Sequence, residues 1–382
     1  MRKVNINMEY VVINFLGKRG GGPLYAFEMT KGLVENGVLP IAIIPDNIEN
    51  LNDWESIPNC LILKVTGYGD SYLSLLKTVV KLLFIEGKKI KKQCKGLDIK
   101  CVYVPMIQPL TLLINRLFKN KKVIVTLHDP IPHKGAKRLL VYLYTKVIKQ
   151  ADKIIVLSNK FVNLTADIYN KNINDIYVIP HGIFDNYKKV YDNKFKYEYD
   201  NSKVNFLFFG RITPYKGLDV LATAFKKLES EFDNIALTIV GNGDFEPYRQ
   251  CYSEIKNVTV INRWIKDEEV YGFYNGANVI TVLPYIEATQ SGVIPVAMAN
   301  DSLVICTNTG GLVEQVVDKE TGYLVEVGDS EALYKVMKSI VDGEYNPWVI
   351  TNAKDYISNL TWDRLAEKLK QIIEQTGKKI QL

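Results

Sequence analysis

Short runs of apolar, β-branched residues recur along the chain, and most are separated by stretches with the apolar spacing of a helix. A first series lies at 11–16, 40–44, 60–65, 101–104, 123–127, 154–157 and 176–179. A second series lies at 206–209, 236–240, 258–261, 279–283, 303–306 and 322–325. Strands that alternate with helices in this way pair into parallel sheets covered by helices. The sequence therefore predicts an α/β protein with two doubly wound, Rossmann-like domains.

The stretch between the two series has a different composition. Residues 183–203 are rich in Lys, Asp, Asn and Tyr and have no long apolar period, which indicates a linker or a surface hairpin. We expect a first domain over 1–185 and a second over 186–360, facing each other across a ligand cleft at the carboxyl ends of their strands. Residues 361–382 are expected to pack back on the first domain. The helical tail 348–380 carries one apolar face: Leu365, Leu369, Ile372 and Ile373.

The chain has few residues suited to disulfides or metal centres. The five cysteines are scattered without a Cys-x-x-Cys pair, which fits a reducing compartment: Cys60, Cys94, Cys101, Cys251 and Cys306. Three histidines are too few for a His-rich metal centre, and we expect His133 and His181 to be structural. No Asp-x-Asp sequence is present, so the usual clamp for a divalent cation is not visible.

The apolar run 10–16 leads into a glycine-rich stretch without a small-residue cleavage site, so we expect a buried first strand and not a secretory signal. No stretch approaches the roughly 18 consecutive apolar residues of a membrane-spanning helix. Two phosphate-binding fingerprints are also absent. Residues 17–22 lack the glycine spacing of a nicotinamide-binding loop, and the Walker pattern does not occur.

Positive charge is concentrated in the first half of the chain. The net charge is +6, but residues 1–180 carry 26 Lys and Arg against 14 Asp and Glu, and residues 71–150 carry 17 against 3. This asymmetry indicates an anionic partner, which could be nucleic acid, a membrane surface or a phosphorylated substrate. A solvated lysine-rich face is the alternative.

The segment 75–95 favours the membrane surface among these partners. It combines seven lysines (77, 81, 88, 89, 91, 92 and 95) with apolar residues that give it an apolar face: Leu75, Val79, Leu82, Leu83 and Ile85. A basic amphipathic helix of this kind can lie on anionic lipid. No nucleic-acid-binding motif accompanies it, so lipid is the favoured partner.

Loops that follow strands of the second series carry the chemistry. Gly210-Arg211 and Lys216-Gly217 lie between a strand and a helix, where a guanidinium and an ammonium can clamp a pyrophosphate. The other loops contribute glycine turns and small residues through which backbone N–H groups can approach an anion: Gly241, Asn242, Gly243, Thr289, Gln290, Ser291, Gly292, Gly310, Gly311, Thr321 and Gly322.

The order and spacing of these motifs resemble the C-terminal half of the retaining glycosyltransferases of family 4, which have the two-domain GT-B fold. The resemblance extends over most of the chain. Gly20-Gly21-Gly22 after the first strand resembles the family's glycine loop, which lies against the donor phosphates and the acceptor. Residues 125–129 resemble the strand whose terminal His, here His128, sits near the donor sugar. Residues 179–183 resemble the junction into the second domain, with His181 in place of Asn.

The resemblance implies a retaining, metal-independent transferase without a cofactor. It would move a sugar from a UDP or GDP sugar to a lipid-linked or other saccharide acceptor in surface polysaccharide or glycolipid synthesis. Such an enzyme would be cytoplasmic and peripheral on the inner face of the cell membrane. The implied catalytic residues are His128, Arg211, Lys216 and Glu287. The implied donor-binding residues are Gly21, Gly22, Gly210, Gly241, Asn242, Gly243, Thr289, Gln290, Ser291, Gly292 and Glu314, with Gly20 and Asp129 on the acceptor side.

One departure from the family pattern concerns its paired glutamates. Without gaps, the two positions fall on Ala288 and Val296, and Glu287 is one residue away. The ribose, which the second glutamate usually holds, would then need Glu314 or a backbone group, and Glu287 could instead be a surface or helix-capping carboxylate. A non-catalytic protein that binds nucleotide sugars or lipids therefore stays open. A sugar-nucleotide epimerase would need further carboxylates, which the sequence does not place.

Overall fold

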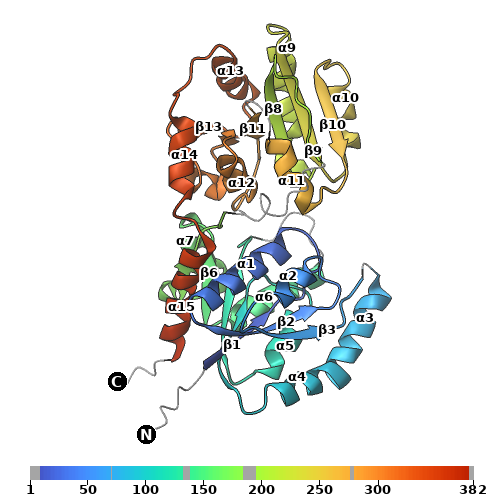
Figure 1. Cartoon of the computed structure of the whole chain (residues 1–382), viewed down its shortest axis with the longest axis vertical. Coiled ribbons are helices and arrows are strands. Elements are labelled where there is room, and N and C mark those ends of the chain that lie inside the picture. The colour runs from blue at the N-terminus through green and yellow to red at the C-terminus, as the bar shows by residue number, and fades with distance from the viewer. Residues whose placement is uncertain (1–8, 70, 132–137, 184–194, 276–278, 378–382) are drawn as a thin grey trace. The chain divides into compact units, whose positions relative to one another are not determined.

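The computed structural model describes residues 9–69, 71–131, 138–183, 195–275 and 279–377. The chain divides into two compact units (Figure 1). Unit 1 comprises Met1–Pro180 and Thr361–Leu382, and unit 2 comprises His181–Leu360. The junction lies a few residues before the expected position because residues 181 and 183 bind to unit 2. His181 N–H donates to Gln290 Oε1 at 3.1 Å, and Ile183 N–H donates to the Leu360 carbonyl at 3.0 Å.

Unit 1 is built on a seven-stranded parallel sheet in the order β3-β2-β1-β4-β5-β6-β7. The strands are the predicted apolar runs of the first half: β1 Glu9–Asn14, β2 Leu39–Pro45, β3 Leu61–Val65, β4 Asp98–Val104, β5 Lys122–Leu127, β6 Lys153–Val156 and β7 Ile176–Val178. The strand order reverses between β1 and β4, which pair with each other. Doubly wound sheets bind ligands outside the carboxyl ends of the strands at such a reversal.

Helices cover both faces of this sheet, because right-handed crossovers on either side of the reversal place them on opposite faces. One face carries α1 (Gly21–Glu35), α2 (Leu51–Glu55) and α15 (Trp362–Gly377). The other carries α3 Tyr72–Lys81, the π-helical turn η1 Leu82–Glu86, α4 Gly87–Gln93, α5 Thr111–Leu117, α6 Arg138–Gln150, α7 Lys160–Tyr169 and the turn η2 Ile173–Asp175. Their apolar side chains join the strands in one buried cluster.

The tail folds as two helices and not one, α14 (Val349–Ile357) in unit 2 and α15 in unit 1. α15 lies directly on α1 (Figure 1). Gly32 makes this close approach possible, because a Cβ there would lie 2.6 Å from the Trp362 carbonyl oxygen. The Asn36 side chain donates to the Asp363 carbonyl at 2.8 Å, and Lys370 Nζ donates to the Asn36 carbonyl at 2.9 Å.

Unit 2 is built on a six-stranded parallel sheet in the order β10-β9-β8-β11-β12-β13. Its strands are β8 Val204–Phe209, β9 Ile235–Gly241, β10 Val258–Asn262, β11 Val279–Leu283, β12 Leu303–Thr307 and β13 Tyr323–Val325. Besides α14, its described helices and 3₁₀ turns are η3 Pro214–Lys216, α9 Leu218–Glu229, η4 Glu246–Tyr248, α10 Arg249–Tyr252, α11 Asp267–Tyr274, α12 Val293–Ala299, η5 Gly310–Glu314 and α13 Ser330–Val341. The strand order reverses between β8 and β11.

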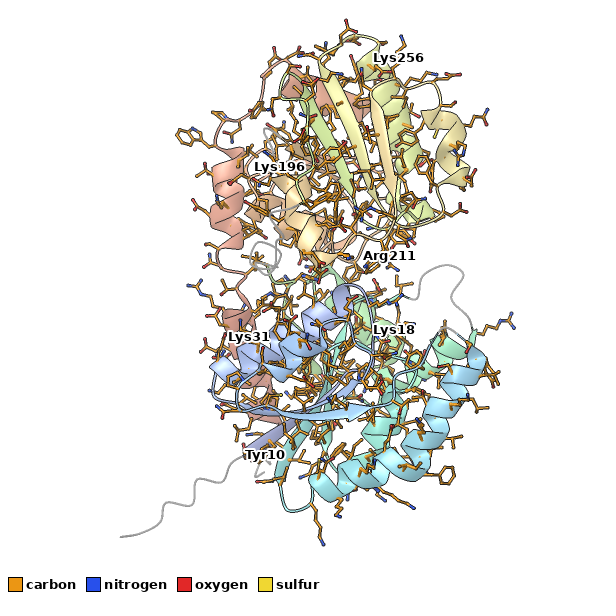
Figure 2. All side chains as sticks on the ribbon, turned by 45° about the vertical axis from the view of Figure 1, so that its right-hand side comes forward. Tyr10, Lys18, Lys31, Lys196, Arg211 and Lys256 are labelled. Atoms are coloured by element: carbon orange, nitrogen blue, oxygen red, sulfur yellow. The ribbon has the colours of Figure 1, made fainter. Side chains whose placement is uncertain are left out.

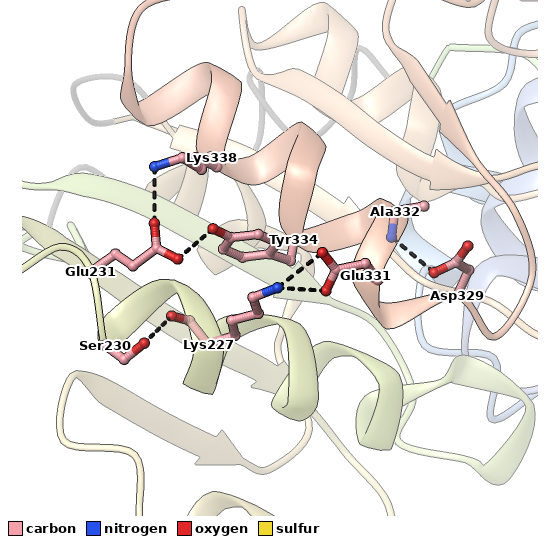
Figure 3. A network of polar contacts seen from close by, with 8 residues as sticks. All are labelled: Lys227, Ser230, Glu231, Asp329, Glu331, Ala332, Tyr334 and Lys338. Carbon is pink, nitrogen blue, oxygen red and sulfur yellow. Dashed lines mark hydrogen bonds and ion pairs between the residues drawn. The ribbon is translucent and has the colours of Figure 1, made fainter.

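Helices α9 and α13 pack side by side through buried faces and are joined at the surface by a polar network (Figure 3). Lys227 Nζ donates to both Glu331 carboxylate oxygens, at 2.7 and 2.9 Å, and Lys338 Nζ donates to Glu231 at 2.9 Å. Hydrogen bonds from Tyr334 and Lys338 lower the pKa of the Glu231 carboxyl. Because these groups are solvated, the buried apolar residues of the two helices contribute more stability than the ion pairs do.

The predicted linker or hairpin at 183–203 is only partly described, since residues 184–194 lie outside the described ranges, as does His133. Residues 195–203 form no strand and pack on α11 instead. The Phe195 and Phe273 rings lie 5.0 Å apart, and the Tyr199 hydroxyl donates to the Phe273 carbonyl at 2.8 Å. This stretch is therefore part of unit 2.

We expect Gly32→Ala to destabilise the protein by about 1–3 kcal/mol, because the new methyl group would press on a backbone oxygen that cannot move without shifting α15. Alanine's better helix propensity, about 1 kcal/mol, offsets only part of this cost. Denaturant unfolding followed by circular dichroism measures the change. Gly21→Ala in the same helix is the matched control, because a Cβ there has no neighbour within 4 Å. Equal stability of Gly32→Ala and the parent would contradict the close approach.

Candidate active site

The glycine loop of unit 1 lies at the reversal between β1 and β4. Gly20 has a φ of +86° and precedes α1, and its N–H donates to Glu49 Oε1 at 2.9 Å. Gly21 opens the helix toward unoccupied space, whereas a Cβ on Gly22 would lie 3.0 Å from Met106 Sδ. The first turn of α1 carries no acidic residue. Its uncapped N–H groups and the helix dipole therefore present positive charge at the place where the fold binds ligands.

His128 joins this loop region to two further segments of unit 1. Its ring follows β5, bonds through Nε2 to the Pro105 carbonyl oxygen after β4 at 3.0 Å, and meets the Tyr25 ring of α1 edge-on at 4.6 Å. Burial lowers the pKa of His128, although the Pro105 carbonyl and Asp129 oppose this shift. A neutral ring that donates from Nε2 keeps an accepting lone pair on Nδ1. Asp129, the next residue, is half-buried.

In unit 2, the loops after β8 and β9 cross with their backbones in contact. Gly210 N–H donates to the Val240 carbonyl and Ile212 N–H to the Asn242 carbonyl, both at 3.0 Å. A Cβ on Gly241 would lie 1.7 Å from the Gly210 oxygen, and one on Gly243 would lie 2.0 Å from the Ile212 oxygen. Both glycines also have positive φ. The predicted glycine turn is therefore a structural requirement of this crossing, and it leaves Asn242 exposed beside it.

The loops after β8 and β11 meet at the strand reversal of unit 2. Gly217 has a φ of +66°, and a Cβ there would lie 1.9 Å from the Pro284 carbonyl oxygen. Ile286 N–H donates to the Tyr215 carbonyl at 2.8 Å. The loop after β12 joins them, because a Cβ on Gly310 would lie 1.6 Å from the Ala288 oxygen. Three loops from distant parts of the sequence are thus fixed to one another.

Arg211 and Lys216 lie on this rigid framework. Arg211 is exposed where β8 ends (Figure 2). Lys216 Nζ lies 3.3 Å from the centroid of the buried Tyr285 ring, which follows β11. A cation over an aromatic face is attracted to it, so Tyr285 orients the ammonium as well as supporting the loop. The structure thus brings both predicted cations to the strand reversal of unit 2.

The small residues at 289–292 are engaged in a way that the sequence did not indicate. Ser291 N–H donates to Gln315 Oε1 at 2.8 Å, and Gln315 Nε2 donates back to the Ser291 carbonyl at 3.0 Å. Gln315 therefore holds the Ser291 N–H in this structure, and a role of residues 289–292 in donor binding stays a prediction. Gln290 Oε1 accepts the His181 N–H. Thr289 and Gly292 are half-buried at the start of α12.

The two candidate glutamates occupy different surroundings. Glu287 is exposed in the loop between β11 and α12, whereas Glu314 is half-buried at the end of η5. The Glu314 carbonyl accepts the Tyr356 hydroxyl of α14. Both residues flank the fixed loops after β11 and β12. Their catalytic and ribose-binding roles stay predictions.

Three residues of these sites were missed by sequence reasoning. Glu49 bonds the glycine loop from the turn after β2, Tyr285 supports Lys216, and Gln315 bridges both sides of Ser291. Tyr285 lies two residues before Glu287 in the loop after the predicted strand 279–283, and only the structure shows its contact with Lys216. Glu49 and Gln315 carry no local signal, because their partners are far away in the sequence.

Among the residues that the structure describes, no three His, Cys, Asp or Glu side chains are placed to hold one metal ion. Independence from metal stays a prediction, to be tested by activity.

Two family models match the chain. The model described as Glycosyltransferase Family 4 matches residues 19–186, and the model described as Glycosyl transferases group 1 matches residues 203–342. The first match includes the glycine loop and His128. The second includes every loop of unit 2 described above, from Gly210 to Glu314. Together they take in about four fifths of the chain.

Individual relatives agree with these matches. The chain is 28% identical over 178 residues to lipopolysaccharide 1,2-N-acetylglucosaminetransferase of Salmonella typhimurium. The matched region covers 43% of this chain and 46% of that protein. It is 27% identical over 266 residues to the capsular polysaccharide biosynthesis glycosyltransferase CapM of Staphylococcus aureus. That matched region covers 64% of this chain and 68% of CapM. The chain thus matches about half of the first relative and two thirds of the second.

Solved structures share the fold. The crystal structure of HepE from Anabaena with UDP and glucose matches with a TM-score of 0.70 at 15% identity, over 96% of this chain and all of that one. This similarity confirms the predicted GT-B fold of two parallel-sheet units.

Because burial lowers the pKa of His128 below the ordinary value of about 6.5, the unfolded chain binds the proton more readily than the folded protein. Stability should therefore fall as the pH drops below about 6.5, until the folded pKa is reached. His128→Gln cannot titrate, and its amide can still donate to the Pro105 oxygen. We expect its urea midpoint to decline less than that of the parent between pH 7.5 and 5. Parallel declines would show that the His128 proton does not contribute.

Proposed function

Since the chain belongs to the glycosyltransferases of family 4, whose two models match its two halves, we propose that it transfers a sugar from a nucleoside-diphosphate sugar to a saccharide acceptor. One observation carries the proposal: three mutually fixed loops hold Arg211 and Lys216 at the strand reversal of unit 2. The names of the lipopolysaccharide and capsular polysaccharide relatives support an acceptor in surface polysaccharide or glycolipid synthesis.

Arg211 and Lys216 would bind the donor pyrophosphate. Both cations are held on loops that glycine contacts make rigid, so little reorganisation is needed when charge develops on the departing nucleoside diphosphate. Preorganised cations in this role replace a divalent metal. Asn242 and Gly243 border the same loops, and Glu314 would hold the ribose. HepE was solved with UDP and glucose, which supports a uridine nucleotide as the first donor to test.

His128 would position the donor sugar. Its Nε2 is committed to the Pro105 oxygen, so a neutral ring offers Nδ1 to a sugar hydroxyl as a hydrogen-bond acceptor. We propose transfer with retention. The bond from C1 to the acceptor oxygen forms on the face from which the bond to phosphate breaks, and a departing phosphate oxygen takes the acceptor's hydroxyl proton. No side-chain nucleophile is required, which agrees with the exposed position of Glu287.

The acceptor would be lipid-linked and met at the inner face of the cell membrane. The excess of lysine and arginine over 71–150 supports attraction to anionic lipid. Over the described ranges, no helix combines the length and apolar character needed to cross a bilayer. We therefore propose attachment to the surface and not insertion across it, through unit 1.

Arg211→Ala and Lys216→Ala should each weaken binding of UDP, or of GDP if that is the donor base, by about ten- to a hundredfold. A charge-assisted hydrogen bond contributes roughly 1.5–3 kcal/mol. Isothermal titration calorimetry with each nucleotide measures the change. Arg249→Ala is the control, because that guanidinium pairs with Glu246 on an exposed turn. Unchanged nucleotide affinity in both variants would contradict the proposal that Arg211 and Lys216 bind the donor pyrophosphate.

Turnover tests the function directly. Purified protein should release nucleoside diphosphate from one member of a panel of UDP and GDP sugars when given a synthetic lipid-linked disaccharide. We expect the rate to persist in excess EDTA and NMR of the product to show the anomeric configuration of the donor.

Each departure from this result has a distinct meaning. Nucleotide binding without turnover across the panel would favour a non-catalytic binding protein. A strict need for added manganese or magnesium would contradict metal independence, and an inverted product would contradict the proposed mechanism.

A further inference from the structure

The helix from α3 through η1 to α4 has two apolar sides, and only one of them is covered. Leu82 is 2% exposed, and Leu75 and Val79 pack against the buried cluster of unit 1. These three residues of the apolar face therefore pack on the protein core and do not contact lipid.

The opposite side of the same helix is apolar and exposed. Leu73, Leu76, Val80, Leu83 and Phe84, which we call the outer stripe, recur at helical spacing on the side away from the core. Leu73 is 69% exposed and Phe84 is 63% exposed. α3 and α4 run along one flank of unit 1 (Figure 1). A row of exposed apolar side chains with charged residues beside it is typical of a surface that binds a protein or a membrane.

The charge around the outer stripe identifies its partner. All cations of the helix are lysines, namely Lys77, Lys81, Lys88, Lys89, Lys91 and Lys92. The one acid, Glu86, is turned inward, where its Oε1 accepts hydrogen bonds from the Thr66 N–H and hydroxyl at 2.9 and 2.7 Å. The outward side is thus apolar and purely cationic. Protein interfaces are depleted in lysine, whereas lysine stems lie well along a bilayer surface with their charge in the head groups.

We propose that the outer stripe inserts into an anionic bilayer, with the neighbouring lysines on the lipid phosphates. The helix then lies in the plane of the interface, as amphipathic helices do when one face is apolar and the other is strongly charged. Its inner face stays on the core of unit 1, held by the Glu86 contacts and by the Thr78 hydroxyl, which donates to the Gly67 carbonyl.

A second exposed apolar group borders the same sheet edge. α6 begins with Leu139 and Leu140 and continues to Tyr142, all exposed. α3 and α6 both start at the carboxyl edge of the sheet, because each follows a parallel strand, and Gly20–Gly22 and His128 lie at this edge too. Tyr144 of α6 donates to the Ile107 carbonyl, and Tyr68 before α3 donates to Gln108. The inserted helix would therefore bring the bilayer to the edge where the glycine loop lies, which rests on the proposed function.

The test is flotation of the purified full chain with two kinds of vesicle, neutral phosphatidylcholine and its mixture with phosphatidylglycerol. The parent should bind the anionic vesicles and ignore the neutral ones. The combined change Leu73→Ser, Leu76→Ser and Phe84→Ser should weaken binding by about ten- to a hundredfold. The control replaces three other exposed apolar residues outside the outer stripe, Ile168→Ser, Ile173→Ser and Val317→Ser, and should bind like the parent.

A lysine variant separates insertion from charge. Replacing Lys88, Lys89, Lys91 and Lys92 with glutamine should remove the part of the binding that high salt also removes, because head-group attraction is screened and apolar burial is not. Parent-like binding by the outer-stripe variant would overturn insertion. Loss of a parent dimer in that variant, seen by size-exclusion chromatography without loss of vesicle binding, would show that the stripe joins two copies instead.

Sugar transfer to a short-chain, water-soluble acceptor is measured on the same samples. Transfer that survives in the outer-stripe variant while vesicle binding is lost supports the inference. If the parent transfers sugar to no acceptor but its vesicle binding depends on the outer stripe, the proposed function is contradicted and membrane insertion is supported. If the parent transfers sugar but binds no vesicles, membrane insertion is contradicted and the proposed function is supported.

Discussion

The site region of unit 2 depends on chain segments that touch backbone to backbone. The loops after β8, β9, β11 and β12 approach so closely that a single methyl group at Gly217, Gly241, Gly243 or Gly310 would overlap a carbonyl oxygen of the facing loop. No side chain can yield to relieve such an overlap. Because these contacts fix the loops, the backbone positions of Arg211 and Lys216 are fixed as well, and the glycine pattern serves the fold and the proposed chemistry together.

This dual role explains why much of the fold was predictable from sequence. Buried parallel strands are continuous apolar runs, and glycines at strand ends mark the crossings, so both sheets and the loops at 210–217 and 241–243 were found. The features that could not be predicted depend on partners distant in the sequence. Nothing near Ser291 indicates that Gln315 holds its N–H, and the inner and outer faces of α3 are both apolar by composition. Only the packing of unit 1 decides which of them is covered.

His128 shows how the environment sets the chemistry of a residue that the sequence identified. An imidazole in water is an ambiguous donor and acceptor near neutral pH. In unit 1 the Pro105 carbonyl fixes one nitrogen as a donor, burial favours the neutral ring, and the Tyr25 ring of α1 limits its orientation. Tyr25 also meets Trp362 of α15 edge-on at 5.3 Å, so the last helix of unit 1 supports the packing around His128.

The contact between α1 and α15 has a consequence for how the protein is made. The Asn36 side chain and the carbonyl that it binds are separated by 327 residues. A ribosome adding about 5–20 residues per second needs roughly 16–65 seconds to synthesise the chain between them. During that interval all of unit 2 is translated, and the side of α1 around Gly32 is not yet covered by α15. Helix α1 therefore waits for this contact while unit 2 is made, and unit 1 is completed only after unit 2.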